Sequence, residues 1–271
     1  MTPDMTPRAS RITLRVIALG YLGLLLAAPV GLVFYRTFEH GIGPAWDAVT
    51  TPEALHAFWL TILMVLVAVP ANTVFGVITA ITLVRHRFPG RGLLNAAIDL
   101  PFAVSPVVIG LALILVYGEG GWFGTWLAEH GIQVIFSTPG MILATMFVSL
   151  PFVVREVQPV LREIGDEQEQ AAATLGASGW QTFWRVTLPS IRWALTYGVV
   201  LATARALGEF GAVSVVSGKL QGQTETATLF VEQRFHNFDL TGAYAASLVL
   251  ALLAIGTLLS MNMLNRRRRP T

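Results

Sequence analysis

Long apolar stretches recur along the chain, and short polar segments separate them. Six stretches qualify, at about 14–38, 57–84, 93–117, 139–160, 190–217 and 240–264. A helix needs about 20 mainly apolar residues to cross the hydrocarbon core of a bilayer, because each residue advances it by about 1.5 Å. All six stretches are long enough. The pattern therefore predicts an all-α, polytopic membrane protein with six transmembrane helices in a single domain, residues 1–271.

Proline residues fall within four of the six predicted spans. Pro151 and Pro159 interrupt the fourth stretch and obscure its limits. Neighbouring helices can satisfy the carbonyls that a proline frees within a membrane, so prolines do not exclude a span. The first stretch is longer than the apolar region of a signal peptide and lacks a small-residue cleavage pattern, so we expect it to be retained.

The composition supports lipid as the main solvent of the chain. Hydrophobic residues make up 54% of the sequence and charged residues 13%, whereas a soluble domain carries roughly 25% charged residues. There is no cysteine, which excludes disulfides and thiolate metal sites.

The basic residues predict the orientation of the chain in the membrane. Fourteen of the 18 lysine and arginine residues belong to the two terminal tails and to the second-to-third and fourth-to-fifth connections, with Arg192 just beyond the last of these. Because such residues accumulate on the cytoplasmic side, both termini are predicted to be cytoplasmic, and no role in nucleic-acid binding is needed. The residues are Arg8, Arg11, Arg15, Arg85, Arg87, Arg91, Arg155, Arg162, Arg185, Arg192, Arg266, Arg267, Arg268 and Arg269.

The longest inward connection, 161–188, has the pattern of a helix, a glycine break and a second helix. Acidic residues precede an alanine-rich run, which favours a helix N-terminus. Gly176 and Gly179 are expected to end that helix, an aromatic stretch follows, and Pro189 suits the first turn of the fifth span. An amphipathic helix lying on the lipid surface is the alternative interpretation of this pattern.

The spacing within this loop resembles the signature loop of ABC-importer permeases. That pattern is Glu-Ala-Ala, three residues, Gly, nine residues and Ile-x-Leu-Pro; here Gln170 stands at the glutamate position and Val186 at the isoleucine position. In the family this loop is the coupling helix, which docks in a groove of a cytoplasmic ATPase subunit. The resemblance therefore implies a docking set of Glu169, Gln170, Ala171, Ala172, Gly176, Leu188 and Pro189.

Two further segments, Asp99–Leu113 and Ala204–Gly218, resemble sulfate, thiosulfate and molybdate permeases. The part from Gly211 to Gly218 is most similar to the W-type subunits of sulfate/thiosulfate importers. Ala227, Thr228 and Leu229 depart from the usual Leu-Pro-Leu of the family. The resemblance implies a type I ABC-importer fold and translocation of sulfate or thiosulfate, with molybdate or tungstate as the alternative substrate.

Arg205 and Glu209 lie within the fifth predicted span. Their i, i+4 spacing places them on one helix face, and the cost of an isolated charge in a bilayer, about 3 kcal/mol, requires both to face protein or water. They are either a structural ion pair or part of the lining of an anion path. Asp99, near the membrane interface, is expected to be a helix-end or interhelix hydrogen-bond partner.

The remaining polar residues predict no site of their own. Hydroxyls in spans usually bond back to their own helix, and this is the expectation for Ser105, Thr203, Ser214 and Ser217. The histidines show no metal-binding spacing. No GxxxxGK[ST] loop is present, so we expect no cofactor on this chain and ATP with Mg²⁺ on a partner ATPase.

Three classes of function could use a polytopic chain of this kind: a permease subunit, a secondary transporter and a membrane enzyme. A secondary transporter with Arg205 and Glu209 as a proton relay would be expected to have more spans and detectable repeats, and a membrane enzyme would need a nucleophile or metal cluster. A non-catalytic permease subunit in the bacterial inner membrane fits best. Its expected partners are an ATPase dimer, a second permease (a T-type paralogue, or a second copy as in molybdate permeases), membrane lipid, and a periplasmic sulfate-binding protein that delivers the anion at outer loops, especially 218–239.

Overall fold

The computed structural model describes the backbone of residues 8–266 and the side chains of 13–259, and within these limits it is helical. The elements are α1 (Arg8–Leu22), η1 (Gly23–Ala27), α2 (Ala28–Phe38), α3 (Ile42–Val49), α4 (Pro52–Arg85), α5 (Arg91–Ala103), α6 (Pro106–Tyr117), α7 (Gly124–Glu129), α8 (Thr138–Ile164), α9 (Glu167–Thr174), α10 (Gly179–Thr182), η2 (Phe183–Thr187), α11 (Leu188–Leu207), α12 (Gly211–Val216), α13 (Ala227–His236) and α14 (Leu240–Arg266). The elements η1 and η2 are single π-helical turns.

Four helices are long and apolar enough to cross a membrane: Thr13–Phe38, Pro52–Arg85, Thr138–Ile164 and Leu240–Leu259. A fifth candidate consists of two helices, α5 and α6, bent by 118°. The fold is thus an all-helical membrane protein with four or five candidate spans among the described residues, against six predicted.

The predicted span at 93–117 consists of two helices, α5 and α6. Val104 and Ser105 are extended between α5 and α6, and Pro106 begins the second helix. A residue that precedes proline avoids the α region, because the proline ring clashes with its backbone. Pro106 therefore acts as a helix start, where its missing N–H is not needed.

The fourth span, whose limits the prolines obscured, is one continuous helix. Helix α8 has 27 residues and includes both Pro151 and Pro159. More than half of its most apolar window, 56%, is buried inside the protein. Arg155, assigned above to the connection after this span, lies inside α8, and Arg192 lies inside α11.

The fifth predicted span, 190–217, is also divided. Helix α11 ends at Leu207 and α12 begins at Gly211, so three residues break the helix. At its other end, α11 does not begin at Pro189: α10, η2 and α11 run without interruption from Gly179. The 20-residue α11 is not among the candidate spans.

Both π turns stand immediately before a proline. The N–H of Leu188 donates to the Phe183 carbonyl, five residues back, and Pro189 follows; the N–H of Ala28 donates to Gly23 in the same way, before Pro29. A proline ring clashes with the carbonyl four residues earlier. Widening the turn by one residue relieves this clash while the helix continues.

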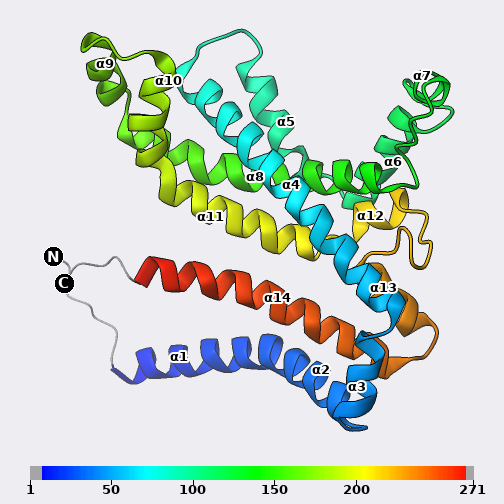
Figure 1. Ribbon diagram of the computed structural model, residues 1–271. Coiled ribbons are helices and arrows are strands. Elements are labelled where there is room, and N and C mark those ends of the chain that lie inside the picture. The colour runs from blue at the N-terminus through cyan, green and yellow to red at the C-terminus, as the bar shows by residue number, and fades with distance from the viewer. Residues whose placement is uncertain (1–7, 267–271) are drawn as a thin grey trace.

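Helix α8 is the centre of the fold and packs between α4 and α11 (Figure 1). Small residues allow the close approach: a Cβ atom on Gly76 of α4 would lie 2.7 Å from a Val153 methyl, and one on Gly198 of α11 would lie 3.0 Å from the Val153 Cα. Van der Waals packing through small residues is the usual means of helix association in membranes. One buried valine therefore fixes both neighbours.

Helices α6 and α12 meet in a second close contact. A Cβ on Gly110 would come within 2.8 Å of the Ala212 carbonyl, and one on Gly211 within 2.8 Å of Pro106. A buried apolar cluster that includes Ile109, Val213 and Val216 surrounds this crossing. The two breaks in the predicted spans therefore pack on each other.

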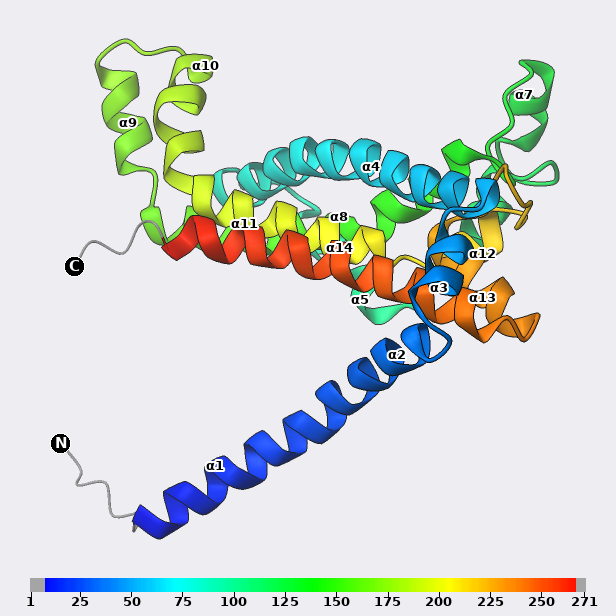
Figure 2. The same ribbon diagram turned by 60° about the horizontal axis from the view of Figure 1, so that its bottom comes forward.

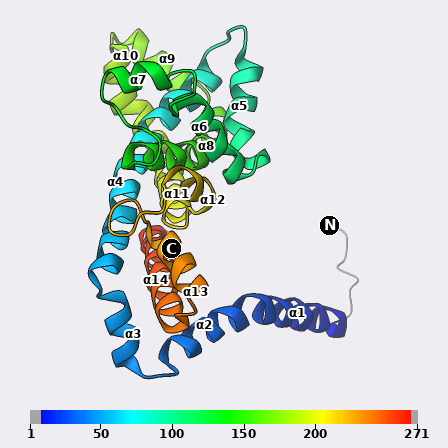
Figure 3. The same ribbon diagram turned by 90° about the vertical axis from the view of Figure 1, so that its right-hand side faces the viewer.

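The N-terminal helix extends away from the other helices, as Figures 2 and 3 show from two directions. The most apolar window of Thr13–Phe38 contains no buried residue. Contacts with α3 and α14 hold only its α2 end. The start of α1, the end of α14 and the α9–α10 segment all lie at one end of the molecule, and α7, α12 and α13 lie at the other (Figure 1). This agrees with the predicted grouping of the terminal tails with the 161–188 loop, although the arginines at 266–269 and at 8 and 11 lie outside the described side chains.

Replacing Gly198 with valine is expected to destabilise the protein by about 1–3 kcal/mol, since the new side chain has no room beside α8. Thermal unfolding of the detergent-solubilised chain, followed by fluorescence, measures the effect. Gly256→Val is the matched control, because no atom lies within 4 Å of a Cβ at that position. Equal melting temperatures for the two variants would contradict the packing argument.

Candidate functional site

Helix α9 ends as the sequence predicts, at Gly176. This residue has a φ of +86°; its N–H donates to Ala173 O (3.0 Å), and the Ala177 N–H donates to Ala172 O (3.0 Å). Together these bonds form a Schellman motif, in which glycine adopts the left-handed conformation at the lowest cost. The glycine break is therefore a defined turn.

The second glycine has a different role from the predicted one. Gly179 does not end α9; it is the first residue of α10. Ser178 precedes it and forms a capping box, with its Oγ accepting from Gln181 N–H (3.3 Å) and its own N–H donating to Gln181 Oε1 (2.9 Å). Such a box satisfies two backbone donors of a helix N-terminus, which fixes the direction of α10.

Apolar side chains cover the outside of this segment. Leu175 is 88% exposed and Trp180 is 70% exposed, and the indole of Trp180 packs edge-on against Trp184. A groove of about 320 Å³ passes between α9 and the helix that follows; it is lined by Ala172, Leu175, Gly176, Ala177, Gln181, Thr182, Arg185 and Val186. Exposed apolar groups at this density are typical of an interaction surface.

The predicted docking residues divide into two groups. Gln170, Ala171, Gly176 and Pro189 are exposed, and Ala172 and Leu188 are partly buried. Glu169 instead points into the protein, where its carboxylate meets the Arg85 guanidinium. From the sequence, Arg85 contributes only to the excess of positive charge in a connection, because residues 84 positions apart in the chain carry no local signal of contact.

A second arginine connects α8 to α5. Arg155 binds the Asp99 carboxylate through Nε (2.7 Å) and Nη2, and its Nη1 also donates to Gln158 Oε1 (2.8 Å) and Asn95 Oδ1 (3.2 Å). This confirms that Asp99 is an interhelix partner. The network ties the half-span α5 to the central helix.

Arg205 and Glu209 form the ion pair that their spacing predicts. Nη1 lies 2.7 Å from Oε2, and the Glu209 side chain is 1% exposed, against 31% for Arg205. The other carboxylate oxygen accepts from the Ala212 N–H (3.0 Å), and the Glu209 carbonyl accepts from Thr228 Oγ1 (2.8 Å). Glu209 thus lies in the break between α11 and α12 and connects it to α13.

Two of the hydroxyls in predicted spans bond to their own helices. Thr203 donates to Val199 O (2.8 Å), and Ser214 donates to Gly211 O (2.9 Å). Ser217 Oγ accepts from the Lys219 N–H (3.1 Å). Among the residues that the structure describes, no three His, Cys, Asp or Glu side chains are grouped to hold a metal ion.

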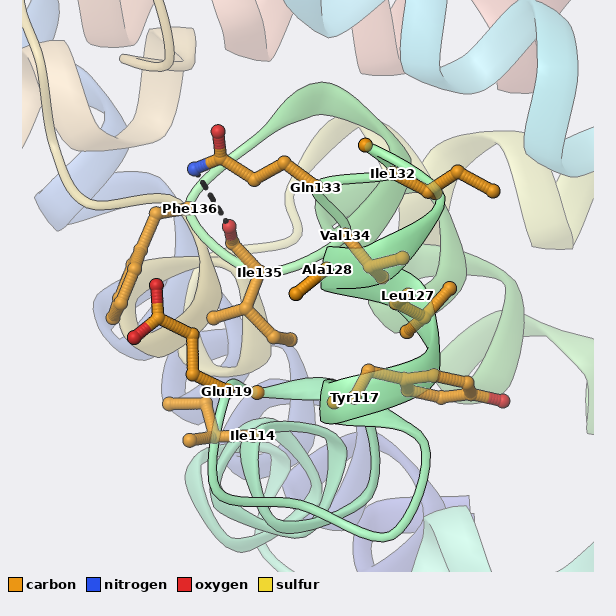
Figure 4. A pocket seen from close by; sticks show the side chains of 13 residues that line it. Ile114, Tyr117, Glu119, Leu127, Ala128, Ile132, Gln133, Val134, Ile135 and Phe136 are labelled. Atoms are coloured by element: carbon orange, nitrogen blue, oxygen red, sulfur yellow. Dashed lines mark hydrogen bonds between the residues drawn. The ribbon is translucent and has the colours of Figure 1, made fainter.

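A cavity of about 550 Å³ opens at the end of the molecule opposite to α9, between α6 and α7 (Figures 1 and 4). Its lining includes Tyr117, Glu119 and Leu127 on one part and the segment 132–136 on another. Phe136 has a φ of +59° and donates its N–H to Val216 O (2.8 Å), which fastens the segment to α12. The sequence predicted no cavity here.

A buried carboxylate lies in the loop before α13. Glu225 is 2% exposed, and its Oε2 has no hydrogen-bond partner among the described residues. Burial raises the pKa of this carboxyl group, and Arg234 opposes the rise. This group was not identified from the sequence, because a lone glutamate in a polar loop is usually solvated.

Comparison with known proteins gives the family. Residues 72–270 match the family model described as binding-protein-dependent transport system inner membrane component. The chain belongs to this family. The matched region begins in α4 and includes α8, the α9–α10 segment and α11, which are the elements that form the packed centre and the exposed turn.

Relatives within this family cover nearly the whole chain. The sulfate transport system permease protein CysW of Synechocystis sp. is 52% identical over 263 residues, which are 96% of this chain and 95% of that one. CysW of Escherichia coli K12 is 49% identical over 254 residues, or 93% and 87% of the two chains. The E. coli permease protein CysT is 40% identical over 247 residues, or 91% and 89%.

A solved structure shares the fold of these inner membrane components. The bacterial ABC transporter involved in import of the acidic polysaccharide alginate aligns with a TM-score of 0.79 at 15% identity, covering 96% of both chains. At this identity the likeness concerns the fold alone. It supports an all-helical membrane fold like that of an ABC-importer permease.

Arg205→Gln is expected to lower the stability of the protein by about 3 kcal/mol, because a carboxylate buried without its cation is costly. Thermal unfolding and gel filtration of the purified chain measure stability and assembly. The double variant Arg205→Gln/Glu209→Gln should recover most of the loss, since it leaves no unpaired charge. A single variant that keeps wild-type stability yet loses transport would contradict the structural role and favour an anion path.

Proposed function

We propose that this chain is a permease subunit of an ATP-driven importer that translocates sulfate or thiosulfate across the bacterial inner membrane. The observation that carries the proposal is the sequence identity of the chain, 52% and 49%, to two sulfate permease proteins over almost its full length. The exposed α9–α10 segment supports the ATP-driven mechanism, because a permease without a nucleotide site needs a surface on which an ATPase can act.

The expected partners follow from the ends of the molecule. The ATPase dimer docks on the apolar face formed by Leu175, Trp180 and the docking residues around them, at the end where α1 starts and α14 finishes. With the arginine-rich tails in the cytoplasm, this face is cytoplasmic. A periplasmic sulfate-binding protein then meets the opposite end, near α7 and the 218–239 segment. Neither partner requires a cofactor on this chain.

A second permease chain completes the path. Four or five candidate spans, or six if α11 with α12 is counted as one, are too few to enclose a gated channel. The exposed Thr13–Phe38 helix and the 40% identity to a CysT protein support pairing with a T-type paralogue. Homodimerisation, as in molybdate permeases, is the alternative.

The proposed mechanism is alternating access. Nucleotide-driven closure of the ATPase dimer draws the docked segments together, and the packed unit of α4, α8 and α11 rocks between inward-open and outward-open states. Docking drives this change only if α9 interacts differently with the two ATPase states. Molybdate and tungstate are the second candidate substrates, since they too are tetrahedral dianions; selection among them is assigned to the binding protein.

A proton-coupled mechanism receives less support. Its candidate relay, Arg205 and Glu209, is occupied by an ion pair and by a backbone hydrogen bond that holds the break before α12. The same contacts favour a structural role over an anion lining, because the carboxylate, 2.7 Å from the guanidinium, partly cancels its positive field.

Uptake of labelled sulfate by proteoliposomes that contain the chain, its T-type partner, the ATPase and the binding protein tests the substrate. We expect ATP-dependent uptake that excess unlabelled thiosulfate lowers more than molybdate does. Strong ATP-dependent uptake of molybdate without uptake of sulfate would contradict the assignment and favour the second candidate.

Leu175→Asp is expected to reduce both co-purification of the ATPase and uptake by at least tenfold, because it places a charge on the exposed apolar face. Leu175→Met is the matched control and should behave as the wild type. Insertion of both variants is checked by membrane fractionation. Wild-type ATPase binding by the aspartate variant would contradict docking at this face.

A further inference from the structure

One carboxylate joins the exposed α9 to two other elements. Glu169 Oε2 accepts from Arg85 Nε (2.8 Å), and its Oε1 accepts from Arg85 Nη2 (3.3 Å) and from Thr187 Oγ1 (2.8 Å). Arg85 is the last residue of α4, and Thr187 is the last residue of the π turn η2. Paired N–H donors on a carboxylate are among the stronger and more directional contacts in proteins.

The same guanidinium also holds the end of α8. Arg85 Nη1 donates to Leu161 O (2.9 Å), and Nη2 donates to Gly165 O (2.6 Å). Carbonyls at a helix C-terminus have no partner within the helix, and a basic side chain satisfies them. Arg85 therefore links α4, α8 and α9 through four hydrogen bonds, all of them made by one planar group.

Apolar packing does not provide a comparable attachment. No residue of α9 is fully buried. Its Glu169 side chain is 23% exposed, and that of its partner Arg85 is 14% exposed. The alanines that face the neighbouring helices leave an open groove that Ile81, Ala173 and Phe183 help to line. The polar junction is thus the principal contact between the body of the protein and α9.

We propose that Arg85 and Glu169 are positioning residues that convey the movement of a docked α9 to α4 and α8. The proposal rests on the proposed function, in which an ATPase moves α9. A pull on α9 reaches the Glu169 carboxylate, then the Arg85 guanidinium, and through it the ends of two long helices at once. Because Val153 holds α4, α8 and α11 together, the three helices follow as one body.

The junction requires arginine and not merely a positive charge. A guanidinium offers five donors in a rigid plane, which serve the carboxylate and two carbonyls together. An ammonium group has three donors around one point and cannot span these acceptors. Arg85→Lys should therefore keep the charge and lose part of the linkage.

The test compares uptake with ATP hydrolysis in the reconstituted transporter. We expect Arg85→Gln and Glu169→Gln each to assemble with the ATPase and to hydrolyse ATP, while uptake per ATP falls at least tenfold. Arg85→Lys should fall between them and the wild type. Arg36→Gln is the control, since Arg36 pairs with Glu39 in an exposed i, i+3 contact far from α9.

The double variant Arg85→Gln/Glu169→Gln decides whether the two residues act through each other. If they do, its uptake per ATP equals that of the worse single variant, because contacting residues are not additive. Multiplied losses, or single variants within twofold of the wild type, would overturn the proposal. Glu169→Gln leaves the α8 carbonyls bound to Arg85, so it remains informative if Arg85→Gln does not assemble.

The outcome separates this proposal from the proposed function. If the wild-type transporter takes up no sulfate, the assignment of sulfate as substrate is wrong. The junction is then tested by comparing, in the variants and the wild type, how much the binding protein stimulates ATP hydrolysis. Wild-type uptake of sulfate with unchanged variants contradicts the junction alone.

Discussion

Val153 contacts two glycines, and these contacts bring the backbone of α8 close to that of α4 on one side and that of α11 on the other. Helices in a bilayer gain little from hiding apolar surface from each other, since lipid tails are equally apolar, so association depends on close van der Waals contact. Gly76 and Gly198 provide that contact in the middle of three long helices. Two polar junctions, Arg155 with Asp99 and Arg85 with Glu169, attach shorter helices to these three.

Three of the paired arginines lie where helices are broken or where a segment leaves the helical body. Arg155 and Arg205 lie near the places where a span is broken. Arg155 pairs with Asp99 of α5, and Arg205 pairs with Glu209 in the break that follows its own helix. Arg85 lies at the end where α9 leaves the helical body. The exposed surface of α9 and α10 differs from these junctions, because it includes the large apolar side chains of Leu175 and Trp180.

The sequence predicted the helical class, four of the spans, the glycine turn at Gly176 and the pair of Arg205 with Glu209. These features depend on local periodicity or on spacings of a few residues. The bend before Pro106 could have been predicted from the rule for residues that precede proline, but hydropathy averaged over 93–117 concealed it. The partnership of Arg85 with Glu169 could not be predicted, because it depends on how α4 packs against α8. The continuity of α10 with α11 was also not predicted. Pro189 suggested a helix start, and the π turn that accommodates it has no characteristic residue pattern in the sequence.

That π turn sets the rotational phase of the segment beyond it. One residue of an α-helix corresponds to about 100° of rotation and a rise of about 1.5 Å. Because α10, η2 and α11 are continuous, removing one residue from Phe183–Thr187 would turn Trp180 through about a quarter of a circle relative to α11. The side chains themselves would be unchanged, yet they would face another direction. The length of this segment is therefore constrained as strictly as its composition.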